Sequence, residues 1–300
     1  MKTHDLAGKV VVITGASSGF GKGAAFRFAG EGASLVLAAR RAELLDDMAS
    51  VFASAGTEAL SVPTDVSHRI EVEHLAQRAV DRFGRIDVWV NNAGVGAIGP
   101  FERIPLEDHV KVVEINLLGT LYGTYYAYQQ FLRQKAGVLI NIASELGQHT
   151  VPYYSSYAAA KHGIVGLDES LQQELSQLDL EDVHVCTVLP TAHDTPFFDH
   201  VANYSGHETA PPKPLHDPDD VVETILKLAI DPHDSEVVGG DGVVKVLMKR
   251  ITPTLAKRMA ARQVHANQIG KAPRAHDKGG AVQAPMSEGT DVSAGRRKND

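Results

Sequence analysis

The sequence predicts an α/β fold, in which a doubly wound parallel sheet is flanked by helices within a single domain. Three observations carry this prediction. Apolar, β-branched runs occur without the alternation of a half-exposed strand, helical segments separate them, and such runs are typical of strands covered on both faces. Polar or glycine-rich turns follow one run after another, at the sheet edge where open α/β sheets bind ligands. The chain of 300 residues is long enough for one large domain of this kind.

The first strand is predicted over residues 9–14, and a glycine-rich turn leads from it into a helix that closes at Gly32. Glycines let the backbone approach a ligand closely, and a helix N-terminus offers free N–H groups and the positive end of its dipole. Strand, turn and helix in this order therefore predict a phosphate cradle for a dinucleotide. The residues of this predicted cradle are Gly15, Ser17, Ser18, Gly19, Phe20 and Gly21.

The second strand is predicted over residues 34–39 and is followed by Arg40 and Arg41. Its end lacks the acidic residue that accepts the adenosine ribose hydroxyls in an NAD site. A guanidinium at this place suits a 2′-phosphate. We therefore expect NADP(H) to be preferred, with NAD(H) still possible; the alternative is that Arg40 only begins a solvated helix.

Two further strands end in polar turns of the same kind. The third, over residues 58–62, leads to Asp65 and Val66, and the fourth, over residues 86–90, leads to an Asn-Asn-Ala-Gly turn. Because the carboxyl ends of parallel strands share one edge of the sheet, we expect both turns to contact the same cofactor. In the second turn the candidate contacts are Asn92, Ala93 and Gly94.

A long helix is predicted over residues 107–133 with Asn116 in its interior, and a fifth strand over 138–143 leads to Ser144. Tyr157 and Lys161 are four residues apart, so on a helix they share one face. An ammonium beside a phenol lowers the phenol pKa toward neutrality, and a hydroxyl can polarise the same substrate oxygen. This set predicts proton exchange with an alcohol or carbonyl; the alternative is a packed tyrosine beside a solvated lysine.

Together these motifs resemble the short-chain dehydrogenase/reductase family. The resemblance covers residues from about 6 to 240 and implies a Rossmann-like domain, a nicotinamide dinucleotide, and hydride transfer between its C4 and a carbonyl or alcohol carbon. The motifs that carry it are Thr14-Gly-x-x-x-Gly19-x-Gly21, Asn91-Asn92-Ala93-Gly94, Asn116, Ser144 and Tyr157-x-x-x-Lys161.

The resemblance also implies a role for each site residue. Tyr157 would be the acid/base and Ser144 would position the substrate oxygen. Lys161 would bind the nicotinamide ribose and lower the tyrosine pKa, while Asn116 would hold a water in a proton relay to that lysine. By the same resemblance, Asp65 and Val66 would contact the adenine and Asn92 would lie beside the adenosine ribose.

The sequence departs from the family pattern at two places. Phe20 stands where the family most often has isoleucine or leucine. After the sixth predicted strand, over residues 183–189, Pro190 is followed by Thr191 instead of glycine. By resemblance Thr195 contacts the nicotinamide carboxamide and Pro190 is a cofactor contact, but Thr191 puts the backbone path here in question.

The remaining chain divides into a lid, an extension and a tail. Residues 191–216 are expected to form a lid within a catalytic domain spanning 1–245, and its aromatic residues suggest an apolar carbonyl or alcohol substrate. A helix over 217–230 and a last strand over 236–240 complete the sheet. The chain is then basic and amphipathic over 246–268, which predicts a helical extension. From residue 269 to 300 its composition predicts disorder.

Composition and residue spacing argue against several other kinds of function. A net charge of −8 argues against nucleic-acid binding, and no apolar run is long enough for a membrane span. The single Cys186 is predicted to be buried and inert, and the chain is expected to be cytoplasmic. No spacing of His149, His193 or Glu145 resembles a metal site, so these residues are assigned to pocket lining or solvent.

Two other functions fit the sequence less well than an oxidoreductase does. A non-catalytic dinucleotide sensor or scaffold would not need all of Asn116, Ser144, Tyr157 and Lys161, and a serine hydrolase at Ser144 lacks the G-x-S-x-G turn. By resemblance, we also expect a homodimer or homotetramer, assembled through the two long helices that end near 133 and 177.

Overall fold

The fold is described from a computed structural model, which places residues 6–209, 211–239, 261–270 and 272–299. Of the predicted extension over 246–268, residues 246–260 lie outside the described residues, and 261–265 are helical. Within the described ranges, no helix is long and apolar enough to cross a membrane.

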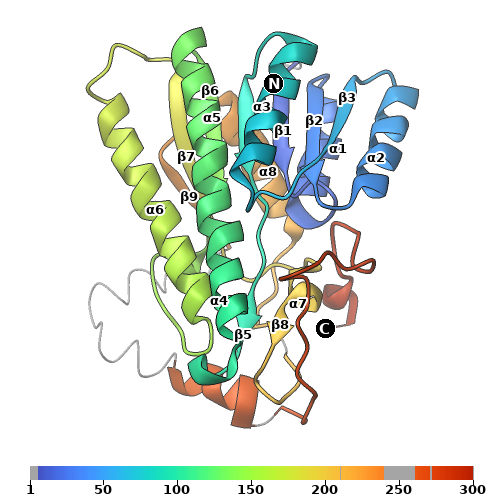
Figure 1. The fold of residues 1–300 in the computed structure, drawn as a ribbon, viewed down its shortest axis with the longest axis vertical. Coiled ribbons are helices and arrows are strands. Elements are labelled where there is room, and N and C mark those ends of the chain that lie inside the picture. Colours follow the sequence, from blue (N-terminus) through green and yellow to red (C-terminus); the bar gives the residue numbers. More distant parts are fainter. Residues whose placement is uncertain (1–5, 210, 240–260, 271, 300) are drawn as a thin grey trace.

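The described chain alternates strands and helices along most of its length (Figure 1). The strands are β1 (Val10–Thr14), β2 (Ser34–Ala39), β3 (Ala59–Pro63), β4 (Val88–Asn91), β5 (Ala97–Ile98), β6 (Gly137–Ile142), β7 (Val183–Pro190), β8 (Ala202–Asn203) and β9 (Ser235–Val238). The α-helices are α1 (Gly19–Gly30), α2 (Ala42–Ser54), α3 (Arg69–Phe83), α4 (Leu106–Val113), α5 (Gly119–Gln134), α6 (Ser155–Leu175), α7 (Phe197–His200) and α8 (Pro218–Ile230).

Seven of these strands form one parallel sheet in the order β3-β2-β1-β4-β6-β7-β9. In the register of the central strands, Val12 of β1 pairs with Val36 of β2 on one side and with Trp89 of β4 on the other. The chain runs outward from β1 in one direction and then returns to continue from β4 in the other. The loops after β1 and β4 consequently lie side by side at the switch point, where doubly wound sheets bind nucleotides.

Helices cover both faces of the sheet, which explains the continuous apolar strands. Helices α1, α2 and α8 pack on one face, with Phe28 and Leu45 fully buried against Ile13. Helices α3, α4, α5 and α6 pack on the other, with Leu75 and Phe131 fully buried. A strand buried on both faces contributes apolar side chains to both cores, so the sheet confirms the predicted fold class.

The predicted long helix over 107–133 is interrupted. The chain runs through α4, a π-helical turn (Glu114–Leu118) and α5, and the turn is centred on Asn116. The small parallel sheet of β5 and β8 was not predicted, because two-residue strands leave no periodic pattern. This small sheet ties the loop after β4 to the segment over 191–216, for which the sequence predicted a lid.

The C-terminal residues 272–299 differ from the disorder that their composition predicted. They contain little helix or strand, yet Ala281 and Val282 are buried and the segment bonds to the domain at many points. The segment is ordered by main-chain carbonyls and a few arginines that meet partners on the domain. Composition does not reveal such long-range partners.

Candidate active site

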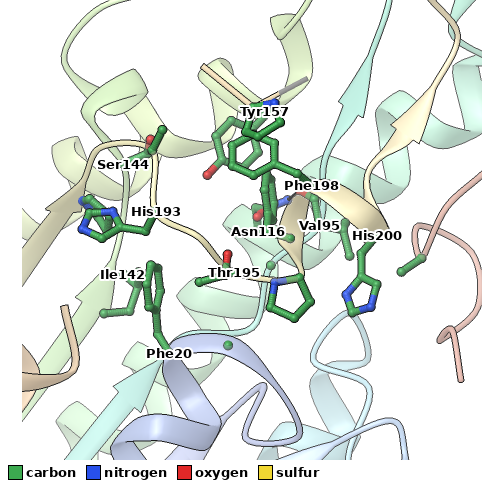
Figure 2. Close-up of a pocket in the computed structure, with 18 of the residues that line it drawn as sticks. Phe20, Val95, Asn116, Ile142, Ser144, Tyr157, His193, Thr195, Phe198 and His200 are labelled. Atoms are coloured by element: carbon green, nitrogen blue, oxygen red, sulfur yellow. Dashed lines mark hydrogen bonds between the residues drawn. The ribbon is translucent and has the colours of Figure 1, made fainter. Parts of the chain in front are cut away.

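A cavity of about 970 Å³ lies at the carboxyl-end edge of the sheet. Loops after β1, β2, β3, β4, β6 and β7 line it, together with the lid, and Figure 2 shows part of its wall. Of all the residues that the sequence predicted for the site, only Gly21 is not on its surface. The predicted residues that line it are Gly15, Ser17, Ser18, Gly19, Phe20, Arg40, Asp65, Val66, Asn92, Ala93, Gly94, Asn116, Ser144, Tyr157, Lys161, Pro190 and Thr195.

The glycines after β1 are required by close packing. Gly15 has a φ of +68°, and a Cβ there would lie 2.8 Å from Ala93 Cα. Gly19 also has a positive φ, of +55°, and a Cβ on Gly21 would clash with the Gly15 carbonyl. Gly21 thus shapes the turn from behind, while Gly15 and Gly19 present their backbone to the cavity.

A hydrogen-bond network fixes the loop after β4 against the loop after β1. The Thr14 hydroxyl accepts from the backbone N–H groups of Asn92 (3.0 Å) and Ala93 (3.2 Å). The Asn92 amide donates in return to the carbonyls of Thr14 (3.0 Å) and Gly15 (3.1 Å). Asn92 therefore holds the two walls of the cavity together at the switch point.

Arg40 and Arg41 form the end of the cavity beyond β2. Arg40 is half-buried rather than solvated and lies near Asp65, whose charge acts against the lowering of the Arg40 pKa by burial. Arg41 donates to the hydroxyls of Ser17 (2.8 Å) and Ser18 (2.8 Å). Sequence reasoning assigned no role to Arg41; the Arg-Arg pair after a strand end was the available signal.

Asn116 lies at the centre of the π-helical turn and is fully buried. Its Nδ2 donates to the carbonyls of Val112 and Val95, both at 2.8 Å. The side chain thus satisfies a carbonyl of its own helix where the regular backbone ladder is interrupted. The Asn116 Oδ1 is buried and has no partner among the described residues, and a Cβ on Gly94 would lie 2.8 Å from it.

Tyr157 and Lys161 leave α6 on the same side, with the Lys161 Nζ 5.6 Å from the centre of the tyrosine ring. Lys161 is buried and donates to the carbonyl of Ile142 at 2.6 Å. Ser144, at the end of β6, reaches the same part of the cavity (Figure 2). The structure therefore brings the three predicted side chains together.

The electrostatics of this group differ from the prediction of a lowered phenol pKa. Burial raises the pKa of Tyr157 to about 12; a hydrogen bond with Ser144 lowers it and the charge of Glu145 raises it further. Burial also lowers the pKa of Lys161 to about 7. Removal from water is the largest effect on the phenol pKa, and the same burial disfavours the charged form of Lys161.

The two departures from the family pattern are accommodated locally. Thr191 donates its N–H to the Val238 carbonyl at 2.9 Å, so the backbone continues the pairing of β7 with β9. Opposite it stands Gly239, where any Cβ would clash with the Thr191 hydroxyl. The Phe20 ring packs edge-on against His193, with ring centroids 5.5 Å apart.

The histidines near the site line the cavity. His149 lies 3.8 Å from the Glu145 carboxylate, and His193 is buried, so the pKa of His193 is lowered by burial. Across the described ranges no group of three or more His, Cys, Asp or Glu side chains is placed to hold a metal ion. Tyr154 and C-terminal residues such as Met286 also line the cavity, and no motif in the sequence predicted their place there.

A parallel sheet with a glycine cradle at its switch point, and with a tyrosine and lysine one helical turn apart in the same cavity, defines a dinucleotide-dependent oxidoreductase. The sequence profile described as short chain dehydrogenase matches residues 9–204. The chain belongs to this family. It is therefore an enzyme that acts on carbonyl or CH–OH groups.

Known proteins resemble the chain over most of its length. An uncharacterized oxidoreductase, YxnA of Bacillus subtilis, is 32% identical over 275 residues, which are 91% of this chain and 77% of that protein. A diacetyl reductase [(S)-acetoin forming] of Staphylococcus epidermidis is 39% identical over 169 residues, 56% of this chain and 66% of that protein. A short chain dehydrogenase/reductase from Burkholderia phymatum, solved in complex with NAD, is 27% identical with a TM-score of 0.75, covering 84% of this chain and 96% of that one.

Proposed function

We propose that the chain is an NADP(H)-dependent carbonyl reductase in which Tyr157 exchanges a proton with the substrate oxygen. The observation that carries the proposal is the continuity of one cavity from the glycine cradle at Gly15 to Tyr157 and Lys161. Its volume of about 970 Å³ lies in the range of cofactor and ligand sites. A cofactor and a substrate can therefore meet inside it.

The residues present fit a nicotinamide dinucleotide. Gly15 and Gly19 line the cavity without side chains that would cover it, and a glycine cradle of this kind accepts phosphates. Asp65 and Val66 would hold the adenine, and Lys161 the nicotinamide ribose. When bound, the cofactor supplies or takes the hydride.

The state of Tyr157 suits the reduction direction. With a pKa raised to about 12 by burial, the phenol is protonated at neutral pH and is ready to give its proton to an oxygen that is gaining negative charge. Ser144 shares a hydrogen bond with it and would donate to the same oxygen. For oxidation of an alcohol the phenol must first lose its proton, so we expect that direction to need a higher pH.

The preference for NADP(H) rests on Arg40 and Arg41. Each guanidinium carries five N–H donors. Arg40 uses two of them on the carbonyls of Ala281 and Val282, and Arg41 uses four on Ser17, Ser18 and the Met286 carbonyl, so each keeps at least one. Together with the hydroxyls of Ser17 and Ser18 they would bind a 2′-phosphate. The test compares kcat/KM for NADPH and NADH: we expect NADPH to be preferred at least about tenfold, and Arg41→Ala to remove most of that preference. A preference for NADH in the unaltered enzyme would overturn the assignment.

The substrate is proposed to be a small ketone, diketone or aldehyde. Phe197 and Phe198 of the lid line the cavity, and the Phe197 ring lies 5.6 Å from that of Tyr157. The likeness to a diacetyl reductase makes 2,3-butanedione the first compound to test. A panel of aliphatic diketones, aryl ketones and aldehydes, followed by loss of NADPH absorbance, would identify the class; no oxidation of NADPH by any of them would contradict the proposal.

We also propose that the enzyme is a cytoplasmic homodimer or homotetramer. Helices α4 and α5 form one side of the molecule and carry several large apolar side chains that are more than a third exposed, a pattern typical of interfaces. These side chains are Leu106, Val110, Leu121, Tyr125 and Leu132. Light scattering should give a mass of at least two chains, and Leu121→Glu with Tyr125→Glu should give monomers.

A further inference from the structure

Residues 281–297, here called the C-terminal strap, cross the edge of the cavity at the carboxyl ends of the strands. Figure 1 shows this segment in red beside α7. Ala281, Pro285 and Met286 of the strap line the same cavity as the glycine cradle. None of these residues belongs to the motifs that place the chain in its family.

The first half of the strap is bound to the wall that would hold the adenosine and phosphates. Arg40 donates to the Ala281 carbonyl at 2.7 Å, and Arg41 donates to the Met286 carbonyl at 3.2 Å. The Gly19 N–H donates to the Asp291 carbonyl at 2.9 Å. Further along the same wall, the Lys22 ammonium donates to the Thr290 carbonyl at 2.9 Å. All four acceptors are main-chain carbonyls of the strap, and all four donors lie on the loop after β1, the start of α1 or the end of β2.

The second half is bound to the opposite wall, which β7 and the lid provide. The buried Asp194 carboxylate accepts from the Ser293 hydroxyl at 3.0 Å and from the Arg297 N–H at 3.1 Å. Arg296 donates to the Thr195 carbonyl at 3.0 Å.

Two ion pairs reinforce this second anchorage. Arg296 pairs with Asp199 of α7, and Arg297 pairs with Asp217 at the start of α8. These contacts use side chains of the strap, whereas the first anchorage uses mainly strap carbonyls, with one ion pair between Lys22 and Asp291 at 3.6 Å. The strap therefore spans the cavity from one wall to the other and is fixed at both ends.

From this bridging geometry we propose that the C-terminal strap forms the outer wall of the dinucleotide site and must open whenever the cofactor enters or leaves. The inference rests on the proposed cofactor site. It adds Ala281, Pro285 and Met286 to the residues that surround the cofactor. Because the strap joins the cradle to the lid, it also couples cofactor exchange to the second wall, where Asp194, Thr195 and Asp199 lie.

The anchoring arginines allow a test in the full-length protein. Arg296→Ala combined with Arg297→Ala weakens the second anchorage and leaves the cradle, Arg40, Arg41 and the catalytic side chains unchanged. The matched control removes two arginines from exposed ion pairs elsewhere: Arg27→Ala, which loses Glu223, and Arg82→Ala, which loses Glu58. Both double variants change the net charge equally.

The measurement is stopped-flow NADPH fluorescence, which gives the association and dissociation rate constants. We expect both to rise about tenfold in the strap variant, equivalent to about 1.4 kcal/mol, and to stay within about twofold in the control, because exposed ion pairs contribute little. Unchanged rate constants would overturn the proposal. A faster association with an unchanged dissociation would also overturn it, since the strap would then compete with the cofactor instead of enclosing it.

A second measurement keeps the test independent of folding in the variant. In the unaltered protein, amide hydrogen exchange over residues 281–297 should slow when NADPH binds, and equal exchange with and without NADPH would contradict an enclosing strap. Failure of the proposed function is distinguishable: in that case the unaltered protein would bind neither NADPH nor NADH.

Discussion

Replacing Lys161 with methionine should stabilise the protein and at the same time abolish turnover. Lys161 is buried, and burial lowers its pKa from 10.5 to about 7. Each pKa unit corresponds to about 1.4 kcal/mol, so holding the charged form in this site costs about 5 kcal/mol relative to the unfolded chain. Methionine has a similar length and no charge.

The gain is reduced by the bond that methionine cannot make. The ammonium donates to the Ile142 carbonyl at 2.6 Å, and a hydrogen bond from a charged group contributes about 1.5–3 kcal/mol. We therefore expect Lys161→Met to be more stable by about 2–3 kcal/mol at pH 6.5. For a domain of this size that is a rise in Tm of about 5 °C.

The difference in stability between Lys161→Met and the unaltered protein should depend on pH. Between pH 7 and 10.5 the native state releases the Lys161 proton while the unfolded chain keeps it, so the stability of the unaltered protein rises with pH in this window. Below pH 7 the group is charged in both states and the full cost is present. The advantage of Lys161→Met should therefore be largest at pH 6.5 and shrink toward pH 10.

The assay is thermal unfolding followed by circular dichroism at pH 6.5 and pH 9.5, with NADPH oxidation measured in parallel. Lys227→Met is the matched control, because Lys227 is exposed and its ion pair with Glu236 should change stability by less than about 1 kcal/mol. A variant that is less stable than the unaltered protein at pH 6.5, or a difference that does not depend on pH, would show that the buried ammonium does not destabilise the fold.

Three further predictions concern the interior. Asn116→Leu leaves the carbonyls of Val95 and Val112 unsatisfied, so chemical denaturation should show a free energy of unfolding lower by about 2–4 kcal/mol. The kcat should also be lower. An unchanged free energy of unfolding would contradict the described hydrogen bonds. Burial raises the pKa of Asp168 to about 7, so this carboxyl group makes the free energy of unfolding fall as the pH rises from about 4 to 7. Unfolding measurements should therefore show that Asp168→Asn becomes more stable relative to the unaltered protein across that window. A stability difference that does not change with pH would count against this prediction. Gly239→Ala should lower the free energy of unfolding by at least about 2 kcal/mol, since φ is +114° and the new methyl group meets the Thr191 hydroxyl. Adding Thr191→Gly should recover part of that loss. A double variant no more stable than Gly239→Ala would argue against the clash.

The strands and the switch point were predictable because their physical causes are local. The first four residues of β1 are apolar and β-branched, and the turn that follows contains the glycines that a close backbone approach requires. Seventeen of the eighteen predicted site residues line one cavity, and the eighteenth, Gly21, shapes the turn behind it. The order of elements along the chain predicted the cradle and the turns at the strand ends, and the resemblance to the family added residues such as Pro190 and Thr195.

Other features depended on contacts between distant segments. The sequence placed an ammonium beside a phenol and predicted a lowered pKa, but burial dominates and raises the pKa of Tyr157. The Asn116 amide, in the π-helical turn, donates to the carbonyl of Val95, 21 residues away. Thr191 is accommodated by Gly239, and the strap is ordered by Arg40 and Asp194. None of these partners is adjacent in the sequence.

In the proposed reaction the Tyr157 phenol gives its proton to a carbonyl oxygen held beside the reduced nicotinamide. The most direct measurement is the comparison of the unaltered enzyme with Tyr157→Phe in NADPH binding and in reduction of the best carbonyl compound of the panel. We expect an NADPH dissociation constant within about twofold of the original and a kcat lower by about 10²–10⁴. A Tyr157→Phe enzyme that keeps most of its kcat would contradict the assignment.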